Sequence, residues 1–367
     1  MYTYSPRLVH VRPEIDHMAA YVPGESQEAF SARTGIAIDQ LIKLNSNESP
    51  YGPAPEVIQA LSDHKNYNNY PDTNSTALRK ALAAYTGVDA RYLMVSHGSN
   101  ELINLLWHIF LSVGDNILCC PPTFSLYTSI TTFCGASVLE VPRTERYELD
   151  IAAIRAALTP ETKLIVLCSP NNPTGNLVPE DDVLDLLDTG RIVVVDEAYT
   201  EFSKRPKGLA HLVPEYSNLI VTRTFSKWAG LAGLRIGYGI FPEWIISYMK
   251  RAQCPFEVNA AGHIAAIETL KRLDYAQDRV QRIVAERERL FQLLASYSFL
   301  QPLSSQGNFI LTEIDEDEVR IETLKAKVES YGIMLRYFQN PYLNNFVRLT
   351  VGKPEHTDRL AIALAEL

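Results

Sequence analysis

Short apolar runs alternate with helix-like segments between residues 93 and 240, and this alternation is the feature that most constrains the fold. The runs are apolar at almost every position, as in Lys163–Cys168 and Ile192–Val195. Strands of this kind are buried on both faces, which is typical of a parallel sheet with helices on each side. The expected strands are 93–95, 117–120, 137–141, 163–168, 192–195, 219–221 and 236–240. The sequence therefore predicts an α/β protein whose large domain has a mostly parallel sheet covered by helices.

The two ends of the chain have sequence patterns that differ from this alternation. Residues before 44 are weakly periodic and interrupted by prolines, which predicts an arm with at most a short helix near Gln27–Thr34. After Pro255, long amphipathic helices at His263–Leu273 and Tyr275–Ser296 precede short strands, which predicts a small α+β domain. The expected boundaries are 1–43 for the N-terminal arm, 44–255 for the large domain and 256–367 for the small C-terminal domain.

Composition argues against several classes of protein. The chain has 367 residues, 46% of them hydrophobic, and a net charge of −9 without a basic cluster, so nucleic-acid binding is not expected. No run approaches the roughly 20 apolar residues that cross a bilayer, and the N-terminus lacks the apolar core of a secretory signal. The five cysteines form no CxxC pair, so reduced core residues are expected and no metal site. A cytoplasmic protein acting on small molecules is predicted.

Functional side chains follow the expected strands at their carboxyl ends. Parallel strands end at one edge of a sheet, and ligands bind at that edge. The residues that each follow a strand are Gly98, Phe124, Asn172, Asp196 and Lys227. The turn at Gly98 leads into a helix through Ser99 and Asn100, where free backbone N–H groups and the helix dipole favour an anion. Ser99 or Asn100 as a simple helix cap is the alternative.

Lys227 lies in a stretch between two apolar runs, Thr222–Arg235. A buried lysine loses its proton easily, and the neutral amine is a nucleophile toward aldehydes. Thr224, Ser226 and Arg235 around it are suited to bind a phosphate, Arg235 with a forked contact. A nucleophilic lysine beside a phosphate cradle predicts pyridoxal 5'-phosphate held as an imine. A surface loop with ordinary basic residues is the reading that this stretch alone leaves open.

Three other residues have predicted contacts with the cofactor ring. Asp196 ends a buried strand and needs a cationic partner, which a protonated pyridine nitrogen would supply. Asn172, within the turn Ser169–Gly175, and Tyr199 can both approach the phenolic oxygen of the ring. Phe124 can stack on the ring. The structural alternatives are a helix cap for Asp196, a plain turn for Ser169–Gly175 and a core position for Phe124. Lys227 is expected to shuttle a proton between the substrate carbon and the cofactor.

Taken together, these motifs resemble the pyridoxal-phosphate-dependent aminotransferases of fold type I, class I/II, and more narrowly the histidinol-phosphate aminotransferases. The matching segments span nearly the whole chain in family order. They are Leu44–Glu48, Pro50–Pro53, Tyr70–Asp72, Gly98–Glu101, Ser169–Gly175, Asp196–Tyr199, Thr222–Arg235, Gln306–Leu311 and Val347–Gly352.

The resemblance implies a homodimer with shared active sites, in which Tyr70 reaches the cofactor phosphate of the partner subunit. It implies that Arg348 binds the carboxylate of glutamate, and that Arg336, Arg348 and Tyr21, with Asn172 nearby, bind the phosphate of the substrate. The implied reaction is the transamination of L-histidinol phosphate with 2-oxoglutarate to imidazole acetol phosphate and glutamate, a step of histidine biosynthesis.

Three departures from the family pattern concern the substrate rather than the cofactor. Phe124 stands where tyrosine is usual, Trp228 follows the lysine in place of a smaller residue, and Glu257 adds negative charge to a pocket for phosphate. An aromatic amino acid aminotransferase is therefore the main alternative. A phosphothreonine decarboxylase-like enzyme fits less well around Leu44–Pro53 and Lys227.

Outside enzymes, this fold occurs as the effector domain of transcription regulators. Such a regulator is expected to have an added DNA-binding domain, for which an acidic chain of 367 residues has no room. A structural protein on the same fold is expected to lack Lys227 or Asp196, and both residues are present.

Overall fold

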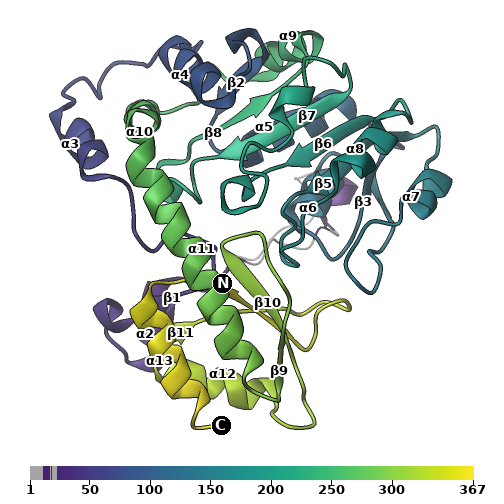
Figure 1. The fold of residues 1–367 in the computed structure, drawn as a ribbon. Coiled ribbons are helices and arrows are strands. Elements are labelled where there is room, and N and C mark those ends of the chain that lie inside the picture. Colours follow the sequence, from purple (N-terminus) through teal and green to yellow (C-terminus); the bar gives the residue numbers. More distant parts are fainter. Residues whose placement is uncertain (1–10, 17, 19–22) are drawn as a thin grey trace.

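The computed structural model describes residues 11–16, 18 and 23–367, and two separate sheets organise it. A seven-stranded sheet fills the upper half of Figure 1, and a smaller sheet of four strands lies below it. Tyr21, one of the predicted substrate ligands, lies outside the described residues.

The large sheet is parallel except at one strand. Its order is β2 (Leu93–Ser96), β8 (Gly237–Ile240), β7 (Leu219–Thr224), β6 (Ile192–Asp196), β5 (Thr162–Cys168), β3 (Asn116–Cys119) and β4 (Ser137–Glu140). β8 runs antiparallel to both β2 and β7, whereas the neighbouring strands from β7 to β4 are all parallel. The predicted mostly parallel sheet is therefore confirmed.

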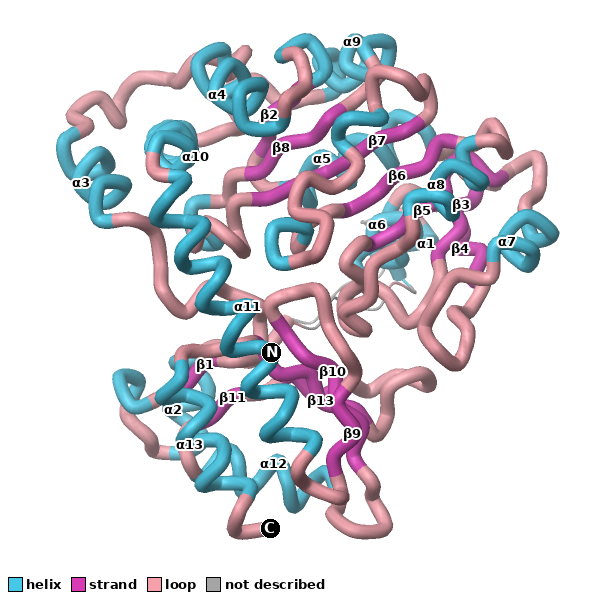
Figure 2. Tube along the Cα trace, viewed as in Figure 1, coloured by secondary structure: helices cyan, strands magenta, loops and turns pink. Residues whose placement is uncertain are grey.

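Helices cover both faces of this sheet, as the apolar strands require (Figure 2). Alternate residues of one strand face opposite ways, so Ile165 and Leu167 enter one hydrophobic core while Leu164 and Val166 enter the other. The second core is completed by α5 (Ser99–Phe110), α6 (Leu126–Phe133) and α9 (Glu243–Ala252). The first is completed by α3 (Pro55–Asp63), α4 (Thr76–Thr86), α7 (Ile151–Ala157), α8 (Glu180–Leu187), α10 (Ala260–Lys271) and α11 (Leu273–Ala295). Burial on two faces is what makes these strands continuously apolar.

The smaller sheet is antiparallel throughout. Its order is β12 (Arg336–Tyr337), β13 (Phe346–Thr350), β10 (Phe309–Ile314) and β9 (Leu300–Pro302). α12 (Ile321–Ser330) and α13 (Pro354–Leu364) lie with it, and the long helix α11 runs from the upper half of the molecule to the lower (Figure 1). The short helices between the main elements are η1 (Ile38–Gln40), η2 (Ala90–Tyr92), η3 (Thr200–Phe202), η4 (Ala210–Leu212) and η5 (Ala232–Leu234).

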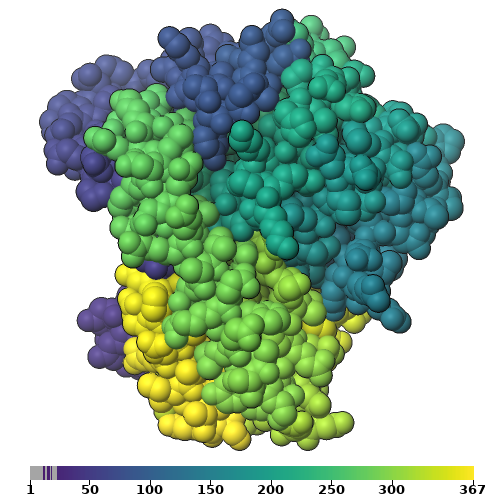
Figure 3. Space-filling model, viewed as in Figure 1, coloured from purple at the N-terminus to yellow at the C-terminus, as the bar shows by residue number. Residues whose placement is uncertain are grey.

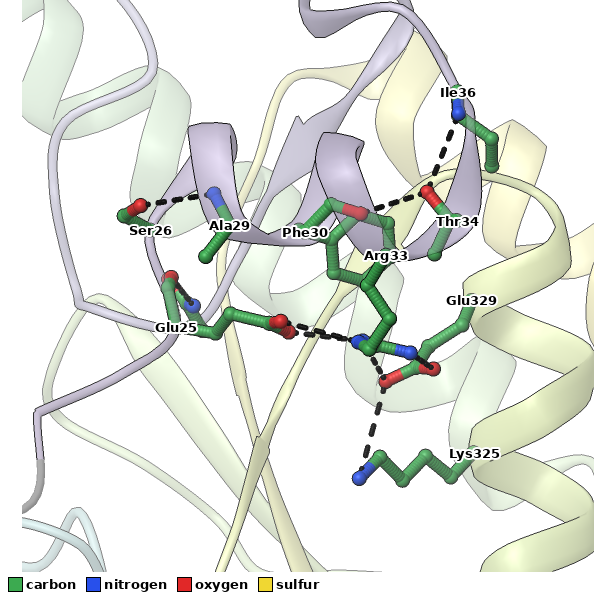
Figure 4. A network of polar contacts seen from close by, with 10 residues as sticks. Glu25, Ser26, Ala29, Phe30, Arg33, Thr34, Ile36, Lys325 and Glu329 are labelled. Atoms are coloured by element: carbon green, nitrogen blue, oxygen red, sulfur yellow. Dashed lines mark hydrogen bonds and ion pairs between the residues drawn. The ribbon is translucent and has the colours of Figure 1, made fainter.

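The described N-terminal segment packs against two parts of the molecule. Its first helix, α1 (Pro13–Asp16), contacts α6 beside the large sheet. The expected helix α2 (Gln27–Thr34) and β1 (Ile42–Lys43) lie against the C-terminal part of the chain, where β1 pairs in parallel with β11 (Ile333–Met334). Figure 3 shows the result as purple atoms beside yellow ones at the lower left. Arg33 donates to Glu25 at 2.9 Å and to Glu329 of α12 at 2.8 Å (Figure 4). The domain boundaries themselves stay a prediction.

Two further properties concern the described residues as a whole. Every helix among them is too short or too polar to span a membrane. The same residues contain no group of three histidine, cysteine or acidic side chains placed to hold a metal ion.

Candidate active site

The carboxyl edge of the large sheet gathers most of the predicted site residues. β2, β5, β6 and β7 end there, at Ser96, Cys168, Asp196 and Thr224. The reversed strand β8 begins at the same edge, because Gly237 pairs with both Ser96 and Thr224. Arg235 therefore reaches this edge by preceding a strand, whereas the other site residues follow one.

Lys227 projects from the turn between β7 and β8. Its Nζ donates a hydrogen bond to the carbonyl oxygen of Ser46 at 3.0 Å. Burial, and then the charge of Arg348, lower the pKa of the amine to about 8, against an opposing effect of Glu48. A lysine with this pKa is partly neutral near physiological pH, as a nucleophile or proton carrier must be. An ordinary exposed surface loop does not describe this stretch.

Asp196 is a buried carboxylate at the end of β6. Its Oδ2 accepts a hydrogen bond from the Tyr127 hydroxyl at 2.8 Å, and its Oδ1 lies 3.4 Å from the Thr222 hydroxyl. Burial raises the pKa of Asp196 to about 6, although the bond from Tyr127 acts in the opposite direction. The next helix, η3, begins at Thr200 after Tyr199, so the reading of Asp196 as a helix cap is wrong. A buried carboxylate of this kind would instead stabilise a cation bound beside it.

Tyr199 and Asn172 meet at this edge, as predicted. The Tyr199 hydroxyl accepts hydrogen bonds from Asn172 Nδ2 at 3.3 Å and from Asn47 Nδ2 at 3.1 Å. Arg348 Nη1 donates to Asn172 Oδ1 at 2.6 Å, so one amide links the phenol to the arginine. Burial raises the pKa of Tyr199, which keeps the phenol neutral. A plain turn at Ser169–Gly175 does not account for these contacts.

Asn45 and Asn47 are site residues to which sequence reasoning assigned no role. Arg348 Nη2 donates to the carbonyl oxygen of Asn45 at 2.9 Å. Asn47 has φ of 54°, a left-handed conformation that asparagine tolerates better than most residues. The density of turn formers in Leu44–Pro53 was the available signal, because long polar loops often carry function.

Arg336 and Arg348 are direct neighbours across two antiparallel strands. Arg336 of β12 is paired in register with Arg348 of β13. Residues opposite each other in such a pair point to the same face of the sheet. Two guanidinium groups on the same face of the sheet are suited to bind an anionic ligand.

The predicted phosphate cradle lies where β2 turns into α5. Gly98 has φ of 81° and precedes the helix, and no side chain caps the helix start. A Cβ built on Gly98 would lie 2.5 Å from Nη2 of Arg235, so the guanidinium packs directly on the turn. The reading of Ser99 or Asn100 as a cap is therefore wrong, because α5 begins at Ser99.

Two hydroxyls complete this cradle. Thr224 Oγ1 donates to Ser226 Oγ at 2.9 Å and accepts from the Ser226 backbone N–H at 3.1 Å. Ser99, Thr224 and Ser226 are buried, whereas Asn100 is exposed. A cation, buried hydroxyls and a helix N-terminus together suit a phosphate group.

Phe124 and Tyr70 differ in how they relate to this cluster. Phe124 is half-buried, and its ring meets that of Tyr127 edge-on at 5.5 Å and 89°. Phe124 thus lies next to the residue that contacts Asp196. Tyr70 is 79% exposed and stacks on Phe256 at 4.2 Å. Its described ring contact is with an exposed residue of this chain, not with the cluster around Lys227.

Trp228 and Glu257, the other two departures from the family pattern, differ in their surroundings. Trp228 is buried and stacks on Tyr85 at 5.5 Å with an angle of 13° between the rings. Glu257 is half-buried, and its Oε1 accepts from Gln253 Nε2 at 2.9 Å. Burial raises the pKa of the Glu257 carboxyl above its usual value.

The residues present fit pyridoxal phosphate. The Gly98–Arg235 contact with Thr224 and Ser226 offers a phosphate site, and Asp196 offers a carboxylate for a protonated ring nitrogen. Lys227 offers an amine of lowered pKa on the same edge. The chemistry of these donors matches the three polar parts of that cofactor.

Comparisons with known proteins agree with this site. Residues 39–364 match the family model described as aminotransferase class I and II. A histidinol-phosphate aminotransferase of Dehalococcoides mccartyi is 40% identical over 358 residues, 98% of each chain. The chloroplastic histidinol-phosphate aminotransferase 1 of Arabidopsis thaliana is 43% identical over 97% of this chain and 85% of the relative. The Sinorhizobium meliloti histidinol-phosphate aminotransferase, solved in complex with pyridoxal-5'-phosphate, is 26% identical with a TM-score of 0.88, covering 99% of this chain and 98% of that one.

Proposed function

The chain belongs to the class I and II aminotransferases, and from that premise we propose that it transfers the amino group of L-histidinol phosphate to 2-oxoglutarate, with pyridoxal 5'-phosphate as cofactor. The products are imidazole acetol phosphate and glutamate, and the step belongs to histidine biosynthesis. Identity of 40% and 43% to two proteins named for this activity supports the substrate.

The observation that carries the substrate class is the cross-strand pair of Arg336 and Arg348. A phosphate monoester carries close to two negative charges at neutral pH, and glutamate carries two carboxylates. Both substrates of the proposed reaction therefore bring an anion that two adjacent guanidinium groups would bind. An aromatic amino acid brings one carboxylate and would leave half of this charge without a ligand.

The side chains have distinct roles in the reaction. Bound pyridoxal phosphate supplies an electron sink for negative charge that develops on the substrate carbon. Lys227 accepts a proton from that carbon and returns it, because its Nζ has a pKa of about 8. Asp196 holds a proton at the ring nitrogen, and Tyr199 with Asn172 orients the phenolic oxygen through the hydrogen bonds that converge there. Arg348 orients the carboxylate of glutamate.

A product assay tests this proposal. The purified protein is given histidinol phosphate and 2-oxoglutarate, and imidazole acetol phosphate and glutamate are measured by mass spectrometry. We expect kcat/KM for histidinol phosphate to exceed that for phenylalanine by about tenfold to a hundredfold, since a charged contact contributes about 1.5–3 kcal/mol. Equal values for both donors would assign the chain to the aromatic aminotransferases.

We further propose a homodimer in which Tyr70 contacts the cofactor phosphate of the partner subunit. The exposed stack of Tyr70 on Phe256 supports this, because paired exposed aromatic rings are suited to an interface. Sedimentation should give twice the mass of the chain, and Tyr70→Ala should release cofactor faster than Tyr67→Ala, which changes another exposed tyrosine of the same loop. A monomer with full activity would contradict the proposal. The expected cytoplasmic location stays a prediction that fractionation of the source cells would test.

A further inference from the structure

Tyr127 of α6 is a wholly buried tyrosine whose hydroxyl ends at Asp196. Its exposed fraction is 0%, and it donates to Asp196 Oδ2 at 2.8 Å. The sequence places it in a helix that mixes apolar and hydroxyl-bearing residues, where a buried tyrosine would be taken for an ordinary core residue. Its polar end nevertheless meets the carboxylate that we assign to the cofactor ring.

Other contacts fix the position of Tyr127. Thr131 Oγ1 donates to the carbonyl oxygen of Tyr127 at 2.8 Å and accepts from Trp107 Nε1 at 2.7 Å. The Tyr127 ring meets Phe124 edge-on on one side and is tilted against Trp107 at 6.4 Å. The hydroxyl is therefore held at the carboxylate by a packed helix, not by a mobile loop.

The other side chains described around Asp196 are weaker donors than Tyr127, although the backbone N–H of Ala198 also stabilises the ionised carboxylate. Thr222 lies at 3.4 Å, which is long for a hydroxyl hydrogen bond. Cys168 of the neighbouring strand stays protonated, because burial raises its pKa to about 12, and burial likewise raises the pKa of Tyr199. The Glu197 carboxylate repels the Asp196 charge and is itself paired with Arg223 at 2.8 Å. Tyr127 thus donates the shorter of the two side-chain hydrogen bonds that stabilise ionised Asp196.

We propose that Tyr127 is a positioning residue that keeps the shared proton on the nitrogen of the cofactor ring instead of on Asp196. A proton between two bases resides on the more basic one, and a hydrogen bond to the ionised carboxylate makes that carboxylate less basic. Tyr127 does not compete for the role of acid, because burial raises its own pKa well above the usual value. The inference rests on the proposed function, since it needs Asp196 to face the ring nitrogen.

The first test uses the protein without cofactor. The pKa of Asp196 in the folded chain, about 6, lies above its ordinary value of 3.8, so its ionisation costs stability as the pH rises through that range. Tyr127→Phe should raise this pKa further. At pH 4.5 the variant should therefore be about as stable as wild type. As the pH rises to 8, its folding equilibrium constant should fall relative to wild type, by about tenfold for each unit that the substitution adds to the pKa of Asp196. A deficit that is the same at every pH would overturn the proposal.

Tyr337→Phe is the matched control. It also removes a phenol hydroxyl, one for which the structure records no hydrogen-bond partner in the described part of the chain. Its effect on the free energy of unfolding should not change with pH. A pH-dependent deficit as large as that of Tyr127→Phe would show that the effect does not belong to Asp196, and would overturn the proposal.

The second test places the proton directly. Both variants and the wild type are loaded with pyridoxal phosphate labelled with ¹⁵N in the ring, and the ring-nitrogen resonance is recorded. We expect a protonated ring in the wild type and in Tyr337→Phe, and a shift toward unprotonated pyridine in Tyr127→Phe. A protonated ring in all three would overturn the role of Tyr127 and leave the proposed function intact. An unprotonated ring in the wild type would overturn both this inference and the role of Asp196 in the proposed function.

Discussion

Asp196 and Glu197 are neighbours in sequence, but their carboxylates lie in regions with opposite electrostatic arrangements. Asp196 belongs to the cofactor edge, which we define as Asp196, Lys227, Arg235 and Arg348, and its side-chain hydrogen bonds come from neutral hydroxyls. Glu197 belongs to the Arg223 cluster, defined as Tyr85, Glu197, Glu201, Arg223 and Tyr238. There Arg223 donates to Glu197 Oε2 through Nε at 2.9 Å and Nη2 at 2.8 Å.

The comparison separates charged groups that stabilise the fold by pairing with each other from charged groups that are suited to bind a ligand. In the Arg223 cluster the buried cation and carboxylate satisfy each other, which is the condition under which a buried pair is tolerated. At the cofactor edge the pKa values of Lys227 and Asp196 move toward neutrality, because no ion pair among the described residues compensates their burial. Groups of this second kind are typical of functional sites.

The largest expected effect is at the cofactor edge. Lys227→Ala removes the nucleophilic amine and the proton carrier together, so transamination should fall by at least about 10⁴-fold. The absorbance of the lysine-bound cofactor should disappear as well. Lys204→Ala, which changes an exposed lysine, is the control and should keep full turnover. Steady turnover in Lys227→Ala would remove this residue from the mechanism.

Breaking the Arg223 cluster should affect stability instead. Arg223→Met leaves Glu197 buried without its cation, which should cost about 3–5 kcal/mol in the free energy of unfolding. Chemical denaturation of the protein without cofactor measures this loss. If the variant is as stable as wild type but loses activity, the distinction between the two regions is wrong.

Asp196→Asn makes the corresponding change at the cofactor edge. It removes an uncompensated buried charge, so the protein without cofactor should keep its stability at pH 8. Cofactor affinity should fall about tenfold to a hundredfold, because a charge-assisted hydrogen bond to the ring is lost. Equilibrium dialysis against pyridoxal phosphate measures the affinity. Unchanged affinity and spectrum would refute the pairing of Asp196 with the ring nitrogen.

Arg336→Ala tests which ligand the cross-strand arginines bind. We expect kcat/KM to fall about tenfold or more for histidinol phosphate and much less for phenylalanine. Arg320→Ala, an exposed arginine before α12, serves as the control and should change neither value. Equal losses for both donors would mean that Arg336 does not recognise the phosphate.

The last prediction is a pH dependence within the Arg223 cluster. Burial raises the pKa of Glu201 to about 8, above its ordinary value of 4.5. Its contribution to stability is therefore present at low pH and lost as the pH rises toward 8. Between pH 6.5 and 8, above the pKa of Asp196, wild type should lose up to about 1.4 kcal/mol per pH unit relative to Glu201→Gln. Parallel stability curves for the two proteins would contradict this assignment.

The sequence predicted those parts of the fold that follow from local patterns. Seven apolar runs became the seven strands of the large sheet, because burial on both faces leaves a continuous hydrophobic signal. The reversed direction of β8 was not predictable, since an apolar run has no direction. β12 has only two residues, too few for a periodicity to show. α9 was missed although its buried residues Ile245, Ile246 and Met249 recur at helical spacing.

The sequence likewise predicted those site residues whose position follows from the order of the strands. Lys227, Asp196, Asn172 and Tyr199 meet at one edge because parallel strands bring their carboxyl ends together. Arg235 joins them because the reversed strand β8 begins at that edge. Tyr127 was missed because its hydroxyl contact with Asp196 depends on packing between α6 and β6, which no local sequence pattern shows. Asn47 was missed as a partner of Tyr199 for the same reason, since 152 residues separate them.

A single-turnover half-reaction tests the central claim most directly. The protein with bound cofactor is mixed, without any keto acid, with histidinol phosphate, phenylalanine or glutamate, and the conversion of the cofactor to its amino form is followed by absorbance. The cross-strand arginines predict fast conversion by histidinol phosphate and by glutamate, and far slower conversion by phenylalanine. Conversion by phenylalanine at the same rate or faster would contradict the assignment of this site to a phosphorylated donor.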